Sequence, residues 1–458
     1  MSFSPDDTIV AIATPPGRGG IGVVRVSGPK AARVAGAVLE RESALPPRVA
    51  TFTRLTRGCS ARDDSTPAHL SDEVVATFFP APRSYTGQDV VEISAHGSPV
   101  VLHAIVRSVV AAGARLARAG EFTLRAFLNG KRDLIQAEAV GDLIAAATPL
   151  QAQVAFDQLD GTLTRRIAAI DAPLFDLIAR LEASLDFPDE GYHFIDICET
   201  QRQLQISIDA IDSLLADAVR GRMIREGATV VIAGRPNVGK SSVFNRLVGA
   251  DRAIVNAIAG TTRDLITEQI DIDGVAITLV DTAGSREALD AIEREGVDRG
   301  ARAIETADLV IVLLDASEPL TVDDERLLER TRDVRRLVVE NKCDRALERA
   351  AHDIAIDARM SAVTGDGFTQ LRSAIARRLT GEERLRDTVA ISNVRHIALL
   401  TAARDDLRRA HAAAGEQTPE EFILTDLQAA RSKLDEVVGV RTSEDVLAHI
   451  FDRFCIGK

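Results

Sequence analysis

The sequence predicts a mixed α/β and all-α fold, in which two α/β domains accompany a helical domain that is discontinuous along the chain. At 458 residues the chain is too long for a single hydrophobic core, and roughly three domains of ordinary size are expected. Short β-branched runs separated by turn residues, typical of strands, occur in residues 1–119 and 227–380. Apolar residues three and four positions apart, typical of helices, fill residues 120–226 and return over 381–458. We therefore expect the second α/β domain to be inserted into one helical domain.

The composition limits the classes of function. The formal net charge of −13, from 55 basic and 68 acidic residues, argues against a protein that mainly binds nucleic-acid backbones regardless of sequence. The four cysteines include no C-x-x-C pair, so we expect neither a disulfide framework nor a zinc site. No signal peptide is recognisable, and no run approaches the ~18 apolar residues of a membrane span. We expect a cytoplasmic protein that is not associated with a membrane.

The N-terminal domain is expected to contain a small sheet. Its sequence contains a Gly-rich segment, residues 15–20 (PPGRGG), that resembles a phosphate loop. No helix with a Lys-Ser pair follows it, so we expect a tight turn and no nucleotide there. The strands are expected at residues 7–13, 21–26, 74–79 and 89–94, and a helix at residues 98–112.

Two residues of the N-terminal part are candidates for a function. Glu92 interrupts an otherwise apolar strand, residues 90–93. Because alternate residues of a strand point to opposite faces, Glu92 either lies on a solvated face or is a ligand carboxylate, and the pattern leaves both interpretations open. Lys131 follows a turn at residues 127–130 that separates two helical stretches.

The helical domain is expected on both sides of the second α/β domain. An acidic break at residues 186–190 (DFPDE) is expected to be a solvated loop, because no His or further carboxylate completes a metal site at ligand spacing. The helices are expected at residues 137–147, 150–163, 167–185, 200–225, 392–414, 420–438 and 442–454.

A phosphate-binding loop organises the second α/β domain. Residues 234–241 (GRPNVGKS) fit G-x-x-x-x-G-K-[ST] and follow a strand expected at residues 228–233. A turn from strand to helix directs backbone N–H groups and the positive end of the helix dipole at a phosphate. Lys240 is expected to reach the β- and γ-phosphates, and Ser241 to bind Mg²⁺.

The next two motifs complete a magnesium and γ-phosphate site. Residues 260–264 (GTTRD) offer a threonine hydroxyl to Mg²⁺. A hairpin with an Asp-Gly turn at residues 273–274 then leads to residues 281–284 (DTAG). Asp281 is expected to order Mg²⁺, and the backbone of Gly284 to approach the γ-phosphate.

The last two motifs select the base. A strand at residues 337–339 leads to residues 341–344 (NKCD), and the carboxylate of Asp344 can accept both N–H groups of guanine. Adenine has no matching pair, so the motif predicts GTP rather than ATP. Residues 361–365 add a backbone turn against the base. The residues expected to line GTP are Asn237, Val238, Gly239, Lys240, Ser241, Ser242, Asn256, Ala257, Ile258, Ala259, Gly260, Thr261, Thr262, Asp281, Thr282, Ala283, Gly284, Asn341, Lys342, Asp344, Ser361 and Ala362.

One position departs from the GTPase pattern. Ras-like enzymes orient the attacking water with a Gln after D-T-A-G, whereas this chain has Ser285. Another group must position the water. Glu293 is a candidate, and the alternative is that it is one of several solvated helix charges.

These motifs, together with others specific to one family, make the chain similar to the MnmE family, also called TrmE, over essentially its whole length. Only the phosphate, Mg²⁺ and guanine motifs are shared with other GTPases. The segments that carry the resemblance are residues 12–20 (IATPPGRGG), 84–92 (SYTGQDVVE), 120–131 (GEFTLRAFLNGK), 133–139 (DLIQAEA), 234–242 (GRPNVGKSS), 260–264, 281–284 and 455–458 (CIGK).

The resemblance implies an architecture and an activity. It implies an N-terminal folate-binding domain that forms a homodimer, a helical domain, and a Ras-like GTPase domain inserted into it. With a flavin-dependent partner, MnmG (also called GidA), the family adds an aminomethyl or carboxymethylaminomethyl group to carbon 5 of the wobble uridine of certain tRNAs. The two proteins form a heterotetramer. The implied cofactors are Mg²⁺, K⁺ and 5-formyltetrahydrofolate or a related tetrahydrofolate that supplies the one-carbon unit, and GTP is the substrate.

The resemblance also assigns roles to residues. Glu293 would be the catalytic glutamate, and Cys455 opens the terminal CIGK motif. Three positions depart from the family pattern: Ala119 and Ser98, which affect backbone shape near the folate domain, and Asn256, which still offers a carbonyl oxygen. The implied ligands are Arg25, Glu92, Lys131 and Lys458 for folate, Asn237, Asn256, Ile258 and Thr261 for K⁺, and Ser241 and Thr262 for Mg²⁺.

Two other classes of protein share the nucleotide motifs. Ribosome-assembly GTPases of the Era and EngA families would be expected to carry a KH-type G-x-x-G domain or a second GTPase domain, and the sequence contains neither. The GTPase module of a membrane transporter would be expected to adjoin transmembrane segments, which the sequence also does not contain.

Overall fold

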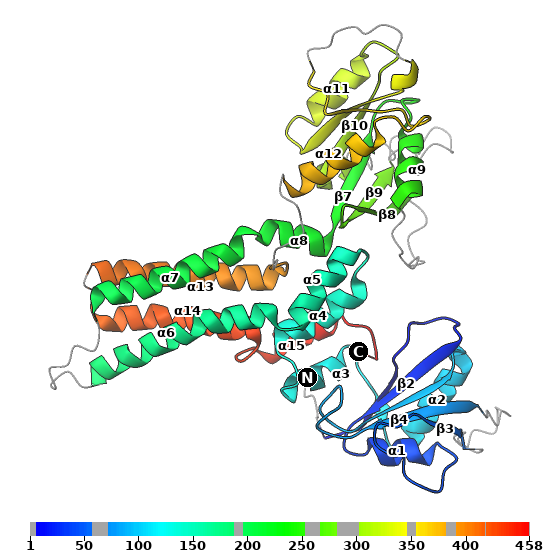
Figure 1. Cartoon of the computed structure of the whole chain (residues 1–458), viewed down its shortest axis with the longest axis vertical. Helices are drawn as coiled ribbons and strands as arrows, with labels where there is room; N and C mark the ends of the chain where they lie inside the picture. Colours follow the sequence, from blue (N-terminus) through cyan, green and yellow to red (C-terminus); the bar gives the residue numbers. More distant parts are fainter. Residues whose placement is uncertain are drawn as a thin grey trace. The chain divides into compact units, whose positions relative to one another are not determined.

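The computed structural model describes residues 6–56, 72–186, 196–251, 266–281, 302–345, 354–381, 391–416 and 418–457. The chain forms two compact units. The first unit comprises Met1–Gly141, Gln158–Arg165 and Ser432–Lys458, and the second comprises Asp142–Asp157 and Arg166–Arg431. Among the described helices, none combines the length and apolar character needed to cross a membrane. The predicted mixture of α/β sheets and long helices is confirmed (Figure 1).

The first unit contains a six-stranded sheet with helices on one face (Figure 1). The strand order is β3-β4-β5-β2-β1-β6, and β6 alone is parallel to its neighbour. Alternate strand residues such as Val24 and Val26 pack against α1 and α2, which turns Arg25, between them, to the other face. The elements are β1 (Ile9–Ile12), β2 (Ile21–Ser27), α1 (Ala31–Ala37), β3 (Thr51–Arg54), β4 (Glu73–Phe79), β5 (Val90–His96), α2 (Pro99–Ala111) and β6 (Arg115–Leu116).

The strands expected in the N-terminal part are therefore present, with ends shifted by one or two residues. The Gly-rich segment at residues 15–20 leads directly into β2, so the predicted turn is confirmed. The sequence analysis did not anticipate α1, β3 or β6. These elements are too short for a periodic pattern to stand out: α1 has 7 residues, β3 has 4 and β6 has 2.

The remainder of the first unit is helical and includes the C-terminal tail. Gly120, in the left-handed conformation, precedes α3, and a methyl group on it would lie 2.6 Å from the Phe451 carbonyl oxygen. Ala119, one of the three positions that depart from the family pattern, pairs with Ile456 in an isolated β-bridge. A methyl group on Gly457 would lie only 2.1 Å from the Ile12 carbonyl oxygen, so the tail packs closely on the end of β1. The helices are α3 (Glu121–Leu128), the start of α4 (Leu134–Ala145) and α15 (Glu444–Phe451).

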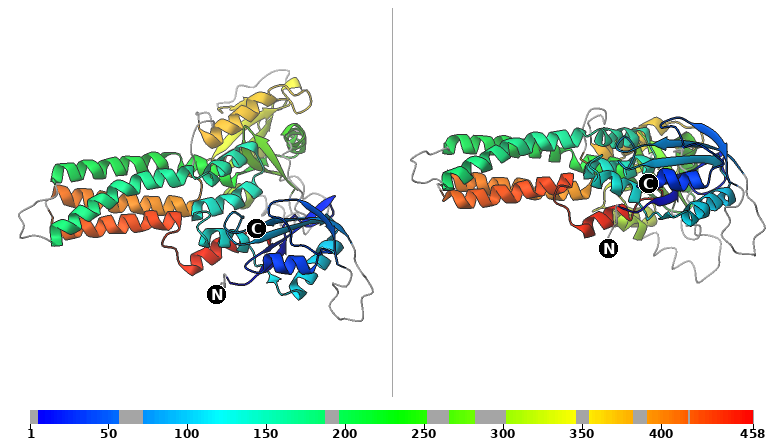
Figure 2. Two further views of the ribbon diagram at one scale, coloured as in Figure 1. Left: turned by 60° about the horizontal axis from the view of Figure 1, so that its bottom comes forward. Right: turned by 90° about the horizontal axis from the view of Figure 1, so that it is seen from below.

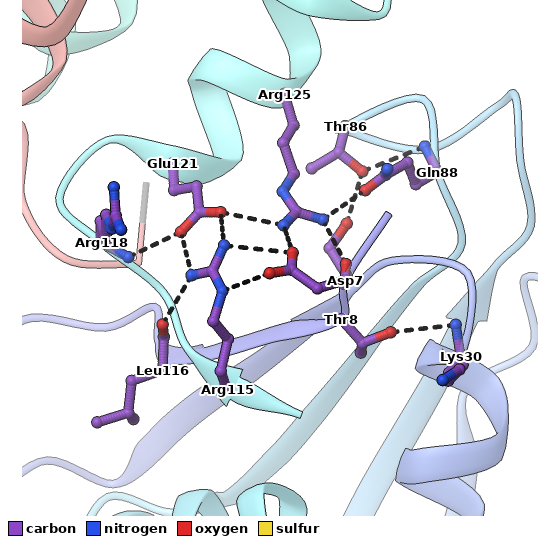
Figure 3. A network of polar contacts seen from close by, with 11 residues as sticks. Asp7, Thr8, Lys30, Thr86, Gln88, Arg115, Leu116, Arg118, Glu121 and Arg125 are labelled. Atoms are coloured by element: carbon purple, nitrogen blue, oxygen red, sulfur yellow. Dashed lines mark hydrogen bonds and ion pairs between the residues drawn. The ribbon is translucent and has the colours of Figure 1, made fainter. Parts of the chain in front are cut away.

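A network of charged side chains joins the start of the chain to α3 (Figure 3). Arg115 donates two hydrogen bonds to the carboxylate of Glu121, over 2.8 and 2.6 Å, and a third to Asp7 over 2.6 Å. Arg125 donates to both carboxylates. Burial acts to raise the pKa of Glu121, but hydrogen bonds from Arg115, the Arg118 backbone and Arg125 outweigh it, so the pKa lies below its usual value. The network therefore holds Glu121 ionised although its side chain is only 2% exposed.

The second unit contains most of a bundle of long helices, which lie side by side (Figures 1 and 2). Arg431 on α14 pairs with Asp171 on α6 at 2.9 Å, and Arg404 on α13 pairs with Asp212 on α7 at 3.2 Å. Of the acidic break at residues 186–190, only Asp186 is described, at the end of α6. The helices are α5 (Pro149–Leu159), α6 (Thr162–Asp186), α7 (Ile197–Ala216), α8 (Ala218–Glu226), α13 (Val394–Gly415) and α14 (Glu420–Val438).

The second unit also contains a six-stranded sheet that is covered on both faces. The order is β12-β11-β10-β7-β9-β8, and every neighbouring pair is parallel except β8 and β9. Val230 and Ile232 enter one core with α9 and α12, whereas Val231 enters the other with α11. The elements are β7 (Ala228–Ala233), α9 (Lys240–Asp251), β8 (Ile266–Ile272), β9 (Val275–Asp281), β10 (Leu309–Asp315), α11 (Val322–Arg330), β11 (Arg336–Asn341), the 3₁₀ helix η2 (Cys343–Arg345), β12 (Ala358–Arg359) and α12 (Phe368–Thr380).

The predicted hairpin turn between β8 and β9 is confirmed. Asp273 and Gly274 both have positive φ, at 54° and 92°, as a two-residue Asp-Gly turn requires. The Thr148 hydroxyl, at the start of α5, donates to the Gly274 carbonyl oxygen over 2.8 Å. The hairpin that ends in Asp281 is therefore attached at its turn to α5.

Candidate functional sites

The phosphate loop lies between the carboxyl end of β7 and the first turn of α9, as predicted. Two glycines shape it: a methyl group on Gly239 would lie 2.3 Å from Asn341 Nδ2, and one on Gly234 would lie 2.7 Å from the Leu313 carbonyl oxygen. The Lys240 ammonium donates to the carbonyl oxygens of Gly234 and Arg235, over 2.9 and 3.0 Å. The loop thus combines a lysine with the N-terminal end of a 12-residue helix, which is the arrangement that binds phosphate.

The two described residues of the predicted magnesium site are in contact. The Ser241 hydroxyl donates to Asp281 Oδ2 over 3.0 Å, where α9 begins and β9 ends. Asp281 is 1% exposed, so its carboxylate is fixed within the sheet edge. A hydroxyl and a carboxylate oxygen are the ligands that Mg²⁺ prefers.

The guanine motif is joined directly to the phosphate loop. Asn341, at the end of β11 and 2% exposed, donates through Nδ2 to the Val238 carbonyl oxygen over 2.8 Å. Its Oδ1 accepts from the Ala362 backbone N–H over 3.0 Å. Ser361 is fully buried beside it. Asp344 lies in η2, three residues beyond the end of β11, with its side chain 21% exposed.

The sequence analysis missed two residues that contact this site, Asp315 and Arg246. Lys342, with φ +64°, donates to Asp315 Oδ2 over 2.6 Å. Burial acts to raise the pKa of Asp315, but hydrogen bonds from Lys342 and Ser317 outweigh it and lower the pKa. Arg246 on α9 donates to the Ala362 carbonyl oxygen over 3.0 Å. The position of Asp315 at the carboxyl end of an apolar parallel strand was a signal that could have identified it.

The remaining residues predicted for the nucleotide site lie outside the described part of the chain. They are Asn256, Ala257, Ile258, Ala259, Gly260, Thr261, Thr262, Thr282, Ala283, Gly284 and Glu293.

In the first unit, Arg25 and Glu92 form a pair on the sheet face opposite α1 and α2. They are directly opposite each other on β2 and β5, and Arg25 Nε donates to Glu92 Oε1 over 2.9 Å. The Arg25 guanidinium also lies over the Tyr85 ring, 5.0 Å from its centroid. Glu92 is therefore on the non-core face, as one interpretation held, and its carboxylate is engaged by a guanidinium.

One other predicted folate residue, Lys131, belongs to a segment that packs against the loop before β5. A methyl group on Gly87 would lie 3.2 Å from Lys131 Cγ, and Asn129 Nδ2 donates to the Thr86 carbonyl oxygen over 2.7 Å. The exposed Lys131 is thus held beside the segment that precedes β5. Cys455 is exposed in the tail, and Lys458 lies outside the described residues.

Comparison with known proteins agrees with this geometry. Residues 8–131 match the family described as GTP-binding protein TrmE N-terminus, and residues 134–455 match the MnmE helical domain. The tRNA modification GTPase MnmE of Koribacter versatilis is 43% identical, with 99% of each chain covered. The protein of the same name from Levilactobacillus brevis is 40% identical, with 99% of this chain and 98% of the relative covered. The one from Legionella pneumophila strain Corby is also 40% identical, with 99% of each chain covered. A solved structure of Era from Aquifex aeolicus is 26% identical over 39% of this chain and 66% of that chain, with a TM-score of 0.28, too low to carry an argument. The two family matches and the relatives together show that this chain belongs to the MnmE family of tRNA modification GTPases.

Proposed function

We propose that the chain is a GTP hydrolase that drives modification of the wobble uridine of tRNA. The observation that carries the proposal is the contact of Asn341 with Val238 at one edge of the second unit's sheet. It joins a loop that presents N–H donors to phosphates to a loop whose carboxylate, Asp344, can pair with guanine. The relatives, which are named tRNA modification GTPases, supply the substrate class.

Within this proposal, Ser241 and Thr262 would bind Mg²⁺ and Asp281 would orient it. The contact of Ser241 with Asp281 supports this, since both oxygens meet where a phosphate-bound cation would lie. Bound Mg²⁺ neutralises charge on the phosphates during transfer. Lys240 would hold the β- and γ-phosphates, and Glu293 would orient the attacking water.

We propose that K⁺ replaces the positive charge of an arginine finger. Asn237, inside the phosphate loop, would contact it together with Asn256, Ile258 and Thr261. Asn237 has φ +64°, a conformation that Asn tolerates better than most residues, so its role in the turn has to be separated from its role toward the ion.

The first unit is proposed to bind 5-formyltetrahydrofolate or a related tetrahydrofolate. The pterin edge carries N–H donors beside a carbonyl acceptor, and the adjacent carboxylate and guanidinium of Glu92 and Arg25 complement that pattern. Arg25 Nη1 is buried and has no hydrogen-bond acceptor among the residues that the structure describes, which supports a ligand at this place. Lys131 and Lys458 would contact the same ligand, near the tail that includes Cys455.

The remaining elements of the proposal concern organisation. The boundaries 1–119, 120–226, 227–380 and 381–458 are proposed for the folate-binding, helical, GTPase and second helical segments. The chain would act as a homodimer in a heterotetramer with the flavin-dependent MnmG, in the cytoplasm, where tRNA is modified.

The experiment that tests the function is mass spectrometry of tRNA nucleosides from a deletion strain. Complementation with the wild-type chain should restore the modified wobble uridine, and Ser241→Ala, which removes a magnesium ligand, should not. A matched control is Ser373→Ala, outside the site on α12. Normal wobble nucleosides in the deletion strain, combined with a defect in ribosome assembly, would favour the Era-like alternative.

A further inference from the structure

Arg132 lies beside the Arg25–Glu92 pair and has no assigned role. It follows Lys131 and precedes α4, and its guanidinium carbon is 5.1 Å from the Tyr85 ring centroid. Arg25 lies 5.0 Å from the same centroid. The Tyr85 hydroxyl is hydrogen-bonded to Thr123 Oγ1 at 2.9 Å, so the ring that both guanidinium groups contact is held in place.

Each of these two arginines has a buried nitrogen without an acceptor. Nη1 of Arg25 and Nη1 of Arg132 are both inaccessible to solvent, and neither has a hydrogen-bond partner among the described residues. A buried N–H that lacks an acceptor is destabilising, and native structures contain few of them. The two donors therefore point to a ligand that supplies acceptor atoms.

The charge of Arg132 is also uncompensated within the described chain. Arg25 is neutralised by Glu92 at 2.8 Å, whereas no described carboxylate forms an ion pair with Arg132. The neighbouring Asp133 is directed elsewhere, accepting from the Gln136 backbone N–H over 2.8 Å and from the Thr164 hydroxyl over 2.6 Å. The missing acceptor is consequently expected to be anionic rather than a neutral carbonyl.

We propose that Arg132 is a specificity residue that binds a carboxylate of the glutamate tail of the folate. This inference rests on the proposed folate function of the first unit. A guanidinium binds a carboxylate through two parallel N–H···O bonds, and the Tyr85 face fixes its plane. Glu92 and Arg25 are suited to the pterin edge, which leaves Arg132 and the exposed Lys131 for the negatively charged end of the ligand.

The test compares two ligands that differ only in the glutamate. Binding of 5-formyltetrahydrofolate and of 5-formyltetrahydropteroate, which lacks the glutamate, is measured by calorimetry on the full chain. Arg132→Met keeps apolar bulk on Tyr85 but removes the charge and the N–H donors. It should weaken binding of the folate by about ten-fold or more and leave binding of the pteroate unchanged. Arg132→Lys keeps the charge but cannot donate two parallel hydrogen bonds, so its affinity for the folate should lie between those of the wild type and Arg132→Met.

The controls separate the possible outcomes. Arg165→Met removes an arginine of the same unit whose ion pair with Asp160 is exposed, and it should change neither affinity. If Arg132→Met binds the folate as tightly as the wild type, or loses affinity equally for both ligands, the role in carboxylate binding is overturned. If Arg132→Met loses tRNA binding while folate binding is unchanged, the role in carboxylate binding is also overturned, and Arg132 would instead bind a phosphate of the tRNA. If the wild-type chain binds neither ligand, the folate function itself fails.

Discussion

Asn341 and Val238 are 103 positions apart in the chain, yet the Asn341 amide donates to the Val238 carbonyl oxygen over 2.8 Å. The same side chain accepts a hydrogen bond from the Ala362 backbone, so one buried amide connects the phosphate loop with both segments predicted to contact the base. The loop proposed to bind the phosphates and the segments proposed to bind the base are therefore held relative to each other by the same residue.

Asp344→Asn is expected to shift base preference from guanine toward xanthine. An amide can donate to the carbonyl that xanthine carries where guanine has its amine. The measurement is the affinity for GTP and for XTP. Asp323→Asn, on the exposed surface of α11, is the control and should change neither. Unchanged GTP affinity in Asp344→Asn would contradict the assignment of the guanine motif.

GTP hydrolysis is expected to be much slower in Na⁺ than in K⁺, and its rate per subunit should fall when the isolated nucleotide domain is diluted. An arginine finger is worth about 10³ to 10⁵ in rate, and K⁺ is proposed to supply the positive charge in its place. Asn237→Ala should lose the response to K⁺. Asn237→Gly keeps a residue that tolerates φ +64° but lacks the side-chain oxygen, so it should lose the response as well. Equal rates in the two salts at saturating GTP would refute the mechanism but not the GTPase assignment.

Glu293→Ala is expected to separate binding from hydrolysis. If Glu293 orients the attacking water, the variant should bind GTP and dimerise as the wild type does but hydrolyse slowly. Single-turnover hydrolysis and equilibrium nucleotide binding measure the two properties. A normal rate would mean that Glu293 is one of the solvated helix charges.

Glu121→Gln is expected to destabilise the first unit at neutral pH by about 3 kcal/mol, because it breaks a buried network of ions. Burial acts to raise the pKa values of Asp7 and Glu121, but the hydrogen bonds from the arginines outweigh it and hold these pKa values below their usual 3.8 and 4.5. A carboxyl group whose pKa is lowered by folding stabilises the folded state. This stabilisation is fully present at pH values above the pKa of the unfolded state, and it is lost as the pH falls through the pKa of the folded state. The difference between wild type and variant should therefore shrink on acidification below about pH 4.5.

Denaturant unfolding, followed at neutral and acidic pH, tests this dependence. Glu73→Gln removes a carboxylate whose ion pair with Arg54 is exposed, and it should cost no more than about 1 kcal/mol. A difference between Glu121→Gln and wild type that is independent of pH would show that the network does not titrate as described.

Removal of residues 455–458 is expected to abolish tRNA modification and leave GTP hydrolysis nearly intact, because the tail is proposed to contact the folate. Gly457→Ala should act similarly through packing, since its methyl group would lie 2.1 Å from the Ile12 carbonyl oxygen. Gly113→Ala is the matched control: its φ is also positive, at 110°, but nothing lies within 4 Å of the added methyl group. Full modification by the truncated chain would show that residues 455–458 are an ordinary terminus.

Much of the nucleotide site was predictable from the sequence, for a physical reason. Motif residues such as Ser241 and Asp281 follow or end parallel strands, and the carboxyl ends of such strands meet at one edge of the sheet. The pair of Asp7 and Arg115, 108 positions apart, was not predictable. Neither residue lies in a motif, and only the tertiary fold, which pairs β1 with β6, brings them together.

The candidate folate site of the first unit also depends on contacts that the sequence does not reveal. The sequence identified Glu92 as unusual, but its pairing with Arg25 depends on the register of β2 and β5, which no periodicity specifies. Arg132 was not singled out, since nothing in its neighbours indicates that it reaches Tyr85.

The packing of Gly457 on Ile12 has a consequence for the order of synthesis. The two residues are 445 positions apart (457 − 12), and Gly120 likewise meets Phe451. At about 5–20 residues per second, a ribosome needs roughly 20 to 90 seconds to make the intervening chain. The end of β1 therefore remains uncovered by this contact until residue 457 has been synthesised. The folate binding proposed for this part of the first unit would therefore require residues 455–457 to have been made, because they complete this packing.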